Sequence, residues 1–176
     1  MTTIIGLQDG NGSSMFADSQ TTNGERPYFH RDLEKIVKRG QYLLAGAGSA
    51  RAVDIAHWLW TPPACHVEDD AFLYEFMIIT FIPSLRKALV FNGFETGPSN
   101  DEDFGMLVSL RGNLFEIASD FSVLVRRDGY YGIGTGASYA VGALSALATP
   151  QEATHIAIQN DIYSGGVVQS LFQEKI

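Results

Sequence analysis

Hydrophobic and polar stretches alternate from the first residues of the chain. Residues 2–6 and 14–20 are short, apolar or β-branched stretches that predict two strands, and the polar sequence Asp-Gly-Asn-Gly at residues 9–12 separates them. Asp-Gly and Asn-Gly pairs tolerate positive φ angles, so the pattern predicts a β-hairpin. Such a hairpin brings Asp18 back towards the beginning of the chain.

A polar segment and two further strands come next. Residues 22–32 are polar and contain Gly24 and Pro27, which predicts a loop. Apolar runs then predict strands at residues 35–38 and 41–47.

Helical periodicity follows the second of these strands. It predicts a helix over residues 50–60. A Gly-Ser pair before this helix offers an N-cap, and two prolines at residues 62–63 end it. A longer helix is predicted over residues 71–90, with an acidic first turn that suits the helix macrodipole and a kink at Pro83. The face of the first helix predicted to be buried holds Ala52, Ile55, Ala56 and Leu59.

The second half of the chain combines hairpins and helices again. In chain order the predictions are a polar loop at 92–103, strands at 106–110, 114–118, 122–126 and 130–133, helices at 138–147 and 151–159, and a strand at 167–172. This order suits two antiparallel sheets between two helical layers, an α+β fold of αββα type. We expect a single domain over residues 1–176.

The composition supports a globular protein and excludes some partners. Hydrophobic residues make up 45% and charged residues 18% of 176 residues, which is enough apolar material for one sizeable core. The net charge of −8 disfavours duplex nucleic acid and anionic membranes, because both require a basic patch. We expect no nucleic acid and no membrane as partners.

The single cysteine and the N-terminal sequence indicate in which cellular compartment the protein is expected. Cys65 has no cysteine to pair with, which indicates a reducing compartment, and a buried or incidental role is favoured over a nucleophile because no base stands beside it. The N-terminus lacks the features of a signal peptide, and the apolar stretch at residues 76–83 is too short to span a bilayer. We expect a cytoplasmic location.

Several segments appear in the order and at about the spacing of one known pattern. They are TTIIG at residues 2–6, FADSQ at 16–20, RDLEKI at 31–36, AGAGSA at 45–50, GIGTG at 132–136 and DIYSGG at 161–166. With this ordered set the sequence resembles, over nearly its whole length, the N-terminal-nucleophile (Ntn) hydrolases of the proteasome β type. That family includes the bacterial two-ring HslV-like peptidase that works with an unfoldase ATPase. Gln20 favours this bacterial branch, whereas residues 161–166 look more like archaeal and eukaryotic proteasomes, so both stay open.

The resemblance implies that Thr2 is the nucleophile once Met1 has been removed. A threonine hydroxyl needs a base, and the free α-amine of an N-terminal residue, with an ordinary pKa of about 8, can supply one. Lys35 would be a buried ammonium that lowers the proton affinity of the hydroxyl and amine, with Asp18 as its partner. The alternatives are that Thr2 merely begins a strand, that Lys35 belongs to a solvated charged run, and that Asp18 only ends a strand.

Four further residues take catalytic positions by the same resemblance. The N–H of Gly48, between a strand and a helix, would stabilise an oxyanion, although the glycine could also serve the turn alone. Thr135, Asp161 and Ser164 would orient the Thr2 amine and a water. The family generally has serine where this chain has Thr135, which keeps the hydroxyl but restricts χ1. Asp161 could instead be a surface acid and Ser164 a turn residue.

The resemblance also implies a pocket for the side chain before the cut. A small and apolar lining suggests a roomy pocket that prefers large apolar side chains. The residues at these positions are Thr21, Leu33, Val37, Gly46 and Ala50.

The function implied is that of a threonine-type endopeptidase. Acyl transfer through Thr2 requires no metal or organic cofactor, so we expect none. Peptides or unfolded proteins would be the substrates of a homo-oligomer of stacked rings, with an ATPase unfoldase as a possible partner. Exposed apolar helix faces would suit the contacts between subunits.

Three other functions are compatible with parts of the sequence. A nucleotide-binding module would use the glycines around Gly46 and Gly48, but the third glycine of the fingerprint falls on Arg51. A non-catalytic ring protein or an Ntn amidase acting on small amides would share the fold. The four histidines lack metal-ligand spacing, so we assign no zinc site.

Overall fold

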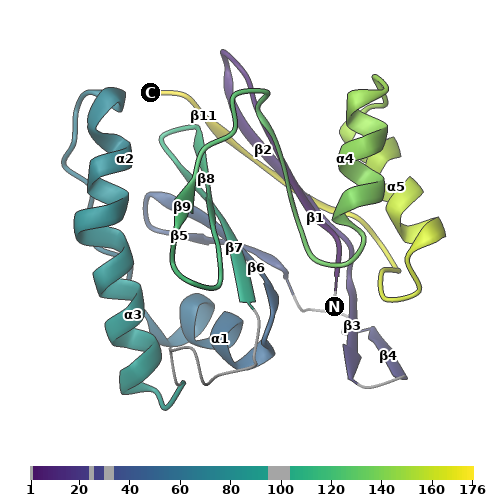
Figure 1. Cartoon of the computed structure of the whole chain (residues 1–176), viewed down its shortest axis with the longest axis horizontal. Helices are drawn as coiled ribbons and strands as arrows, with labels where there is room; N and C mark the ends of the chain where they lie inside the picture. Colours follow the sequence, from purple (N-terminus) through teal and green to yellow (C-terminus); the bar gives the residue numbers. More distant parts are fainter. Residues whose placement is uncertain (1, 24–25, 30–33, 95–103) are drawn as a thin grey trace.

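The computed structural model describes residues 2–23, 26–29, 34–94 and 104–176. Two antiparallel sheets lie face to face, and each is covered on its outer side by helices (Figure 1). This arrangement confirms the predicted αββα layering.

The four-stranded sheet contains the beginning and the end of the described chain. Its order is β10-β1-β2-β11, and every neighbouring pair is antiparallel. The hairpin predicted at the start of the chain is therefore confirmed. The strands are β1 (Ile4–Gln8), β2 (Gly12–Ala17), β10 (Tyr130–Ile133) and β11 (Gln169–Glu174).

The five-stranded sheet is a meander in chain order. The turn between β7 and β8 has positive φ angles at Arg111 (54°) and Gly112 (75°), which is the geometry that a two-residue hairpin turn requires. All the strands predicted in this region are present. They are β5 (Ile36–Arg39), β6 (Tyr42–Gly48), β7 (Phe104–Leu110), β8 (Asn113–Ile117) and β9 (Val123–Leu124).

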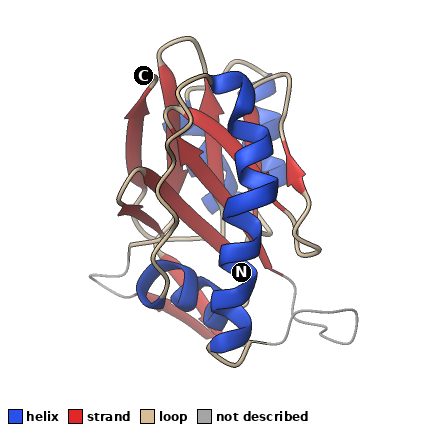
Figure 2. Cartoon of the chain, turned by 90° about the vertical axis from the view of Figure 1, so that its left-hand side faces the viewer, coloured by secondary structure: helices blue, strands red, loops and turns tan. Residues whose placement is uncertain are grey.

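One helical layer covers the outer face of the five-stranded sheet. Figure 2 shows its long helix lying across the strands. At the place of the predicted kink, a π-helical turn precedes Pro83, and this wider turn accommodates a residue without an N–H. The segments are α1 (Ala50–Asp54), η1 (Ile55–Leu59), η2 (Asp70–Phe72), α2 (Leu73–Phe76), η3 (Met77–Phe81) and α3 (Ile82–Phe91).

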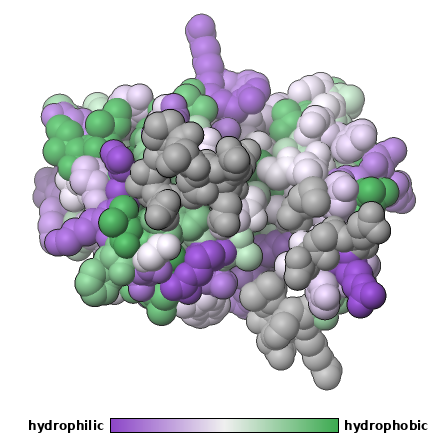
Figure 3. Space-filling view, turned by 60° about the horizontal axis from the view of Figure 1, so that its bottom comes forward, coloured by the Kyte–Doolittle hydropathy of each residue, from purple (hydrophilic) through white to green (hydrophobic). Residues whose placement is uncertain are grey.

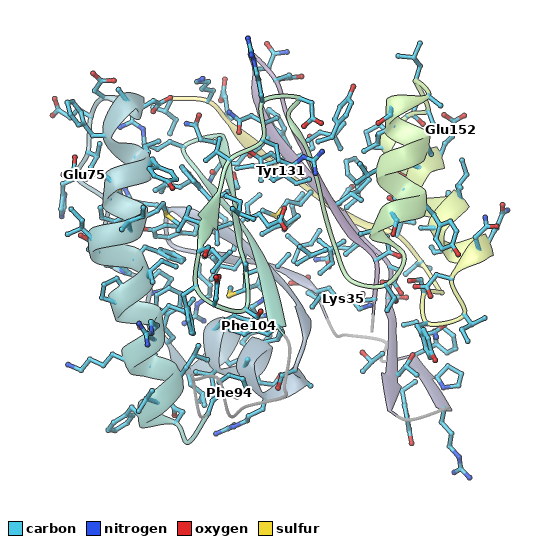
Figure 4. All side chains as sticks on the ribbon, viewed as in Figure 1. Lys35, Glu75, Phe94, Phe104, Tyr131 and Glu152 are labelled. Carbon is cyan, nitrogen blue, oxygen red and sulfur yellow. The ribbon has the colours of Figure 1, made fainter. Side chains whose placement is uncertain are left out.

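Helices α4 (Ala137–Ser145) and α5 (Pro150–Asn160) cover the four-stranded sheet. Helix α5 begins with a capping box in which Thr149 and Glu152 exchange hydrogen bonds. Apolar side chains fill the space between the sheets and beneath both helical layers, and Tyr131 belongs to the cluster between the sheets (Figure 4).

Two sequence-based expectations differ from the structure. The polar loop predicted over residues 22–32 contains instead a two-stranded hairpin of β3 (Gln20–Asn23) and β4 (Arg26–Phe29), because β-branched Thr21 pairs across from aromatic Tyr28. Leu59 is exposed, since the π-helical turn η1 rotates it away from the buried face.

Other expectations fall partly outside the described chain. Of the polar loop predicted at 92–103, residues 95–103 are outside the described residues. Cys65 is buried and unpaired, as expected. No helix in the described parts of the chain combines the length and the apolar character needed to cross a bilayer.

Candidate active site

The residues just before strand β1 contact a buried ion pair that lies between the two sheets. Thr2 lies two residues before β1, and only 4% of it is exposed. Its Oγ1 donates a hydrogen bond to Oδ1 of Asp18 at 2.5 Å and accepts one from Nζ of Lys35. The β1–β2 register, with Ile4 opposite Ala17, brings Asp18 to this position. Figure 4 places Lys35 between the sheets, near the beginning of the chain.

Lys35 lies in the interior and not in a solvated charged face. Its Nζ is 2.7 Å from Oδ1 of Asp18 and donates a hydrogen bond to the carbonyl oxygen of Gln20 at 2.5 Å. Burial lowers the pKa of Lys35 below its ordinary value of 10.5, and the charge of Asp18 opposes this shift. A buried ammonium in contact with the Thr2 hydroxyl is therefore a defined feature of the fold.

Backbone N–H groups hold the carboxylate of Asp18 in place. The N–H of Thr3 donates to Oδ1 at 2.9 Å, and those of Gln20 and Gly165 donate to Oδ2 at 3.1 and 2.9 Å. A buried charge is tolerated when it is both paired and fully hydrogen-bonded, and Asp18 meets both conditions. The carboxylate thus ties the chain start to the β2–β3 connection and to the segment before β11.

A second polar network lies on the other side of the chain start. Oδ2 of Asp161 accepts hydrogen bonds from Oγ1 of Thr135 at 2.7 Å and from Oγ of Ser164 at 2.6 Å. Ser164 Oγ is in turn 2.7 Å from Oγ1 of Thr3. The structure therefore brings Thr135, Asp161 and Ser164 together, and it connects them to the hydroxyl of Thr3.

Sequence analysis assigned no role to Thr3. Its hydroxyl is fully buried and bonded to Ser164, whereas Thr2 is bonded to Lys35 and Asp18. Successive side chains of an extended segment point to opposite sides, so the two threonines serve different networks. The only signal in the sequence was the pair of adjacent threonines, which does not tell which hydroxyl faces which group.

Two glycines allow the turn before α4 to approach the first residues closely. Gly134 has a φ of 90°, and a Cβ there would overlap the carbonyl oxygen of Thr2. A Cβ on Gly136 would overlap Oγ1 of Thr3, while its N–H donates to the Thr2 carbonyl at 3.4 Å. Larger residues at either position would displace the chain start.

A cavity of about 100 Å³ adjoins Thr2. Gly48 ends β6 with a φ of 95° and shares the cavity wall with Thr2, so its backbone faces the region where a substrate would lie. The lining residues are Thr2, Thr21, Glu34, Lys35, Gly46, Ala47, Gly48, Ala50, Val53, Asp54, His57 and Trp58.

The lining agrees only in part with the predicted substrate pocket. Thr21, Gly46 and Ala50 line the cavity as expected. Val37 does not: it is packed in the core beneath the outer helices, and Leu33 lies outside the described residues. Apart from Ala50, the residues that helix α1 and turn η1 contribute were not predicted, because the helical spacing was used only to find a buried face.

The arrangement can activate a hydroxyl. An adjacent ammonium lowers the proton affinity of Thr2 Oγ1, and the fixed carboxylate keeps the ammonium in place. Among the described residues, no cluster of histidine, cysteine, aspartate or glutamate side chains could hold a metal ion. Met1, whose removal would free the Thr2 amine, lies outside the described residues.

Comparison with solved structures defines the fold class. The chain has the fold of the proteasome β-type Ntn hydrolases over nearly its full length, which confirms the resemblance at the level of fold. No model of a protein family matches the sequence, and no curated protein does.

Three solved structures illustrate this likeness. The chain is similar to BPH of Thiobacillus denitrificans in complex with epoxomicin, at 22% identity over 98% of each chain with a TM-score of 0.78. It is similar to eukaryotic HslV from Trypanosoma brucei, at 21% identity over 98% of this chain and 99% of that chain with a TM-score of 0.67. It also resembles an Anbu mutant from Hyphomicrobium sp. strain MC1, at 16% identity over 99% of this chain and 82% of that chain with a TM-score of 0.66.

Proposed function

We propose that this chain is a threonine-type peptidase whose nucleophile is Oγ1 of Thr2 after loss of Met1. The single observation that supports the proposal is the contact of Thr2 Oγ1 with the buried Lys35 ammonium and the Asp18 carboxylate. A fold needs no buried ion pair at this point, since an apolar replacement is often as stable. A reactive hydroxyl at the chain start explains why the pair is there.

Catalysis by this site is acyl transfer. Thr2 Oγ1 attacks the carbonyl carbon of the scissile peptide bond, and its proton passes to the free α-amine of the same residue, directly or through a water. The backbone N–H of Gly48 stabilises the oxyanion, and the C–N bond breaks as the leaving amine takes up that proton. Water then hydrolyses the ester and regenerates the hydroxyl.

The polar network at Asp161 supports this chemistry from the other side of the chain start. Its hydroxyls fix Thr3 and thereby the backbone that carries the nucleophile. Thr135 and Ser164 also supply polar groups near the position of the freed amine. No metal or organic cofactor takes part in these steps.

The working form in this proposal is a homo-oligomer of stacked rings that encloses the sites. Exposed apolar side chains on the outer helices favour contacts with other subunits, and they include Ile78 and Ile79. Figure 3 shows hydrophobic side chains on the left of this face, where those helices lie. Peptides or unfolded proteins are the substrates, and an ATPase unfoldase would deliver folded ones.

Peptide hydrolysis by the purified chain tests the proposed function. The processed protein should cleave fluorogenic peptides, and a Thr2→Ala variant should lose at least about 10³-fold of that rate because the nucleophile is gone. Thr2→Ser keeps a hydroxyl and serves as the matched variant, which should retain measurable activity. Equal rates for the Thr2→Ala and unmodified proteins would contradict the proposal.

A further inference from the structure

One face of the helix after β6 forms a wall of the cavity beside Thr2. The residues involved are spaced by three or four positions, which places them on the same side of α1 and η1. This face includes two titratable side chains where a substrate-binding wall of small apolar residues was expected. Its members are Ala50, Val53, Asp54, His57 and Trp58.

His57 is the most unusual group in this wall. It is 2% exposed, and its Nε2 has no hydrogen-bond partner in the part of the chain that the structure describes. Burial lowers the pKa of His57 to about 4, with a smaller effect from Arg39, so the imidazole is neutral near pH 7. A buried polar atom without a partner is costly, and a ligand that bonds to it removes this cost.

Two carboxylates line the same cavity. Glu34 and Asp54 are both exposed, and neither forms an ion pair within the described residues. Lys35 is the other charged residue of the lining, and its charge is balanced by Asp18. The uncompensated charge of the cavity wall is therefore negative.

Arg39 does not reverse this balance. Its guanidinium donates to the carbonyl oxygen of Trp60 at 3.0 Å, and Arg39 lines a different cavity. Glu34 and Asp54 thus remain available to a cationic group that enters beside Thr2.

We propose that the cavity beside Thr2 binds the side chain of arginine or lysine, with Glu34, Asp54 and His57 as its specificity-determining residues. A guanidinium presents five donors and no acceptor, which suits two carboxylates and an acceptor nitrogen. The aliphatic stem packs on Val53, and the cation can lie against the Trp58 ring. This inference rests on the proposed function, and it replaces the expected preference for large apolar side chains.

Peptides that differ only in the residue before the scissile bond test the specificity. With arginine, lysine, leucine, glutamine or glutamate at that position, kcat/KM for arginine or lysine should exceed that for leucine by about tenfold or more, and glutamate should be poorest. Asp54→Asn and Glu34→Gln should each lower the arginine-to-leucine ratio by about fivefold, the size of one exposed ion pair. If the active protein cleaves the leucine peptide as fast as the arginine peptide, the inference is overturned.

A charge-matched control separates this effect from net charge. Glu75 is exposed on helix α2, and Figure 4 shows it at the outer helical layer, far from Lys35. Glu75→Gln should leave the arginine-to-leucine ratio unchanged. If the arginine-to-leucine ratio falls equally in Glu75→Gln and Asp54→Asn, the preference comes from the net charge of the protein, which would count against the proposed residues.

Binding of a small cation tests the cavity without catalysis. The cation p-aminobenzamidine should bind the Thr2→Ala protein, and adding Asp54→Asn should weaken this binding about fivefold. Binding of uncharged benzyl alcohol should be the same with and without Asp54→Asn. If no peptide is cleaved but this binding is seen, the proposed function fails and the cation site stands. If leucine peptides are cleaved and the amidine does not bind, the function stands and the cation site is wrong.

Discussion

Nζ of Lys35 lies 2.7 Å from Oδ1 of Asp18, and water reaches little of either side chain. Taking two such charges out of water costs several kcal/mol per ion unless pairing and hydrogen bonds compensate. Here three backbone N–H groups complete the coordination of Asp18, and the ammonium is left in contact with the Thr2 hydroxyl. The pair is therefore built into the fold at the hydroxyl of Thr2.

Removal of the ammonium is expected to impair both activity and stability. Lys35→Ala should lower peptide hydrolysis by about 10³-fold or more and lower the free energy of unfolding by about 3–5 kcal/mol, because Asp18 is left buried and unpaired. Lys38→Ala is the matched control, since Lys38 is exposed on strand β5, which Lys35 directly precedes. Kinetics and thermal unfolding of both variants check this, and full activity in Lys35→Ala would refute the assigned role.

A methyl group at Gly136 should disrupt the polar network. The Cβ of Gly136→Ala would overlap Oγ1 of Thr3 and crowd Asp161 and Ser164, so we expect lower activity and a lower melting temperature. Gly142→Ala, in helix α4 with open space around the new methyl, should instead stabilise by about 0.5–1 kcal/mol. Equal effects of the two substitutions would mean that the close approach at Gly136 is unimportant.

The hydroxyl of residue 135 should matter more than its methyl group. Thr135→Ser keeps the donor to Asp161 and should change kcat by only a few-fold, whereas Thr135→Ala removes a bond to a charged acceptor worth about 1.5–3 kcal/mol. Side-by-side measurement of kcat and KM distinguishes the two. A loss of similar size in both variants would show that side-chain shape, not the hydrogen bond, governs this position.

His57 should make the protein less stable in mild acid. Folding lowers its pKa from 6.5 to about 4, so between these pH values the imidazole is protonated in the unfolded chain and neutral in the folded chain. The stability contribution is complete above pH 6.5 and is lost as the pH falls towards 4, with a magnitude on the order of 3 kcal/mol. Thermal unfolding against pH should show this decline on top of that of the carboxylates.

Two measurements isolate the contribution of His57. In a His57→Gln variant the decline between pH 6.5 and 4 should be smaller, and His155→Gln, on an exposed part of α5, controls for loss of an imidazole. An NMR titration of the ring itself reports its pKa directly. A ring that titrates near 6.5 would contradict the burial described here.

Periodicity in the sequence predicted most of the secondary structure, for local reasons. Gly12 and Gly112 adopt positive φ angles of 149° and 75°, which glycine tolerates, so both hairpins could be predicted from the glycines between apolar stretches. Hairpin β3–β4 could not, because its pairing relies on Thr21 and Tyr28 in a segment whose composition is that of a loop. Likewise, no local pattern marks the π-helical turn that exposes Leu59.

The spacing of residues along the sequence could not by itself predict which side chains meet in the candidate site. Asp18 directly follows strand β2 and Lys35 directly precedes strand β5, which belongs to the other sheet, so only the resemblance suggested that they meet. Thr3 and His57 were missed because each is identified by the direction of its side chain within the fold. The charge of the cavity wall likewise became visible only when Glu34 and Asp54 were found beside the same opening.

The proposed role of Thr2 depends on whether the mature chain begins at this residue. Intact mass and N-terminal sequencing of the purified protein, before and after reaction with an electrophile that captures N-terminal threonine, report where the chain begins and which residue reacts. We expect a chain that begins at Thr2 and a single adduct confined to it. A chain that keeps Met1 and still cleaves peptides, or an adduct on Cys65 with Thr2 unmodified, would contradict the proposed role of Thr2 as the nucleophile.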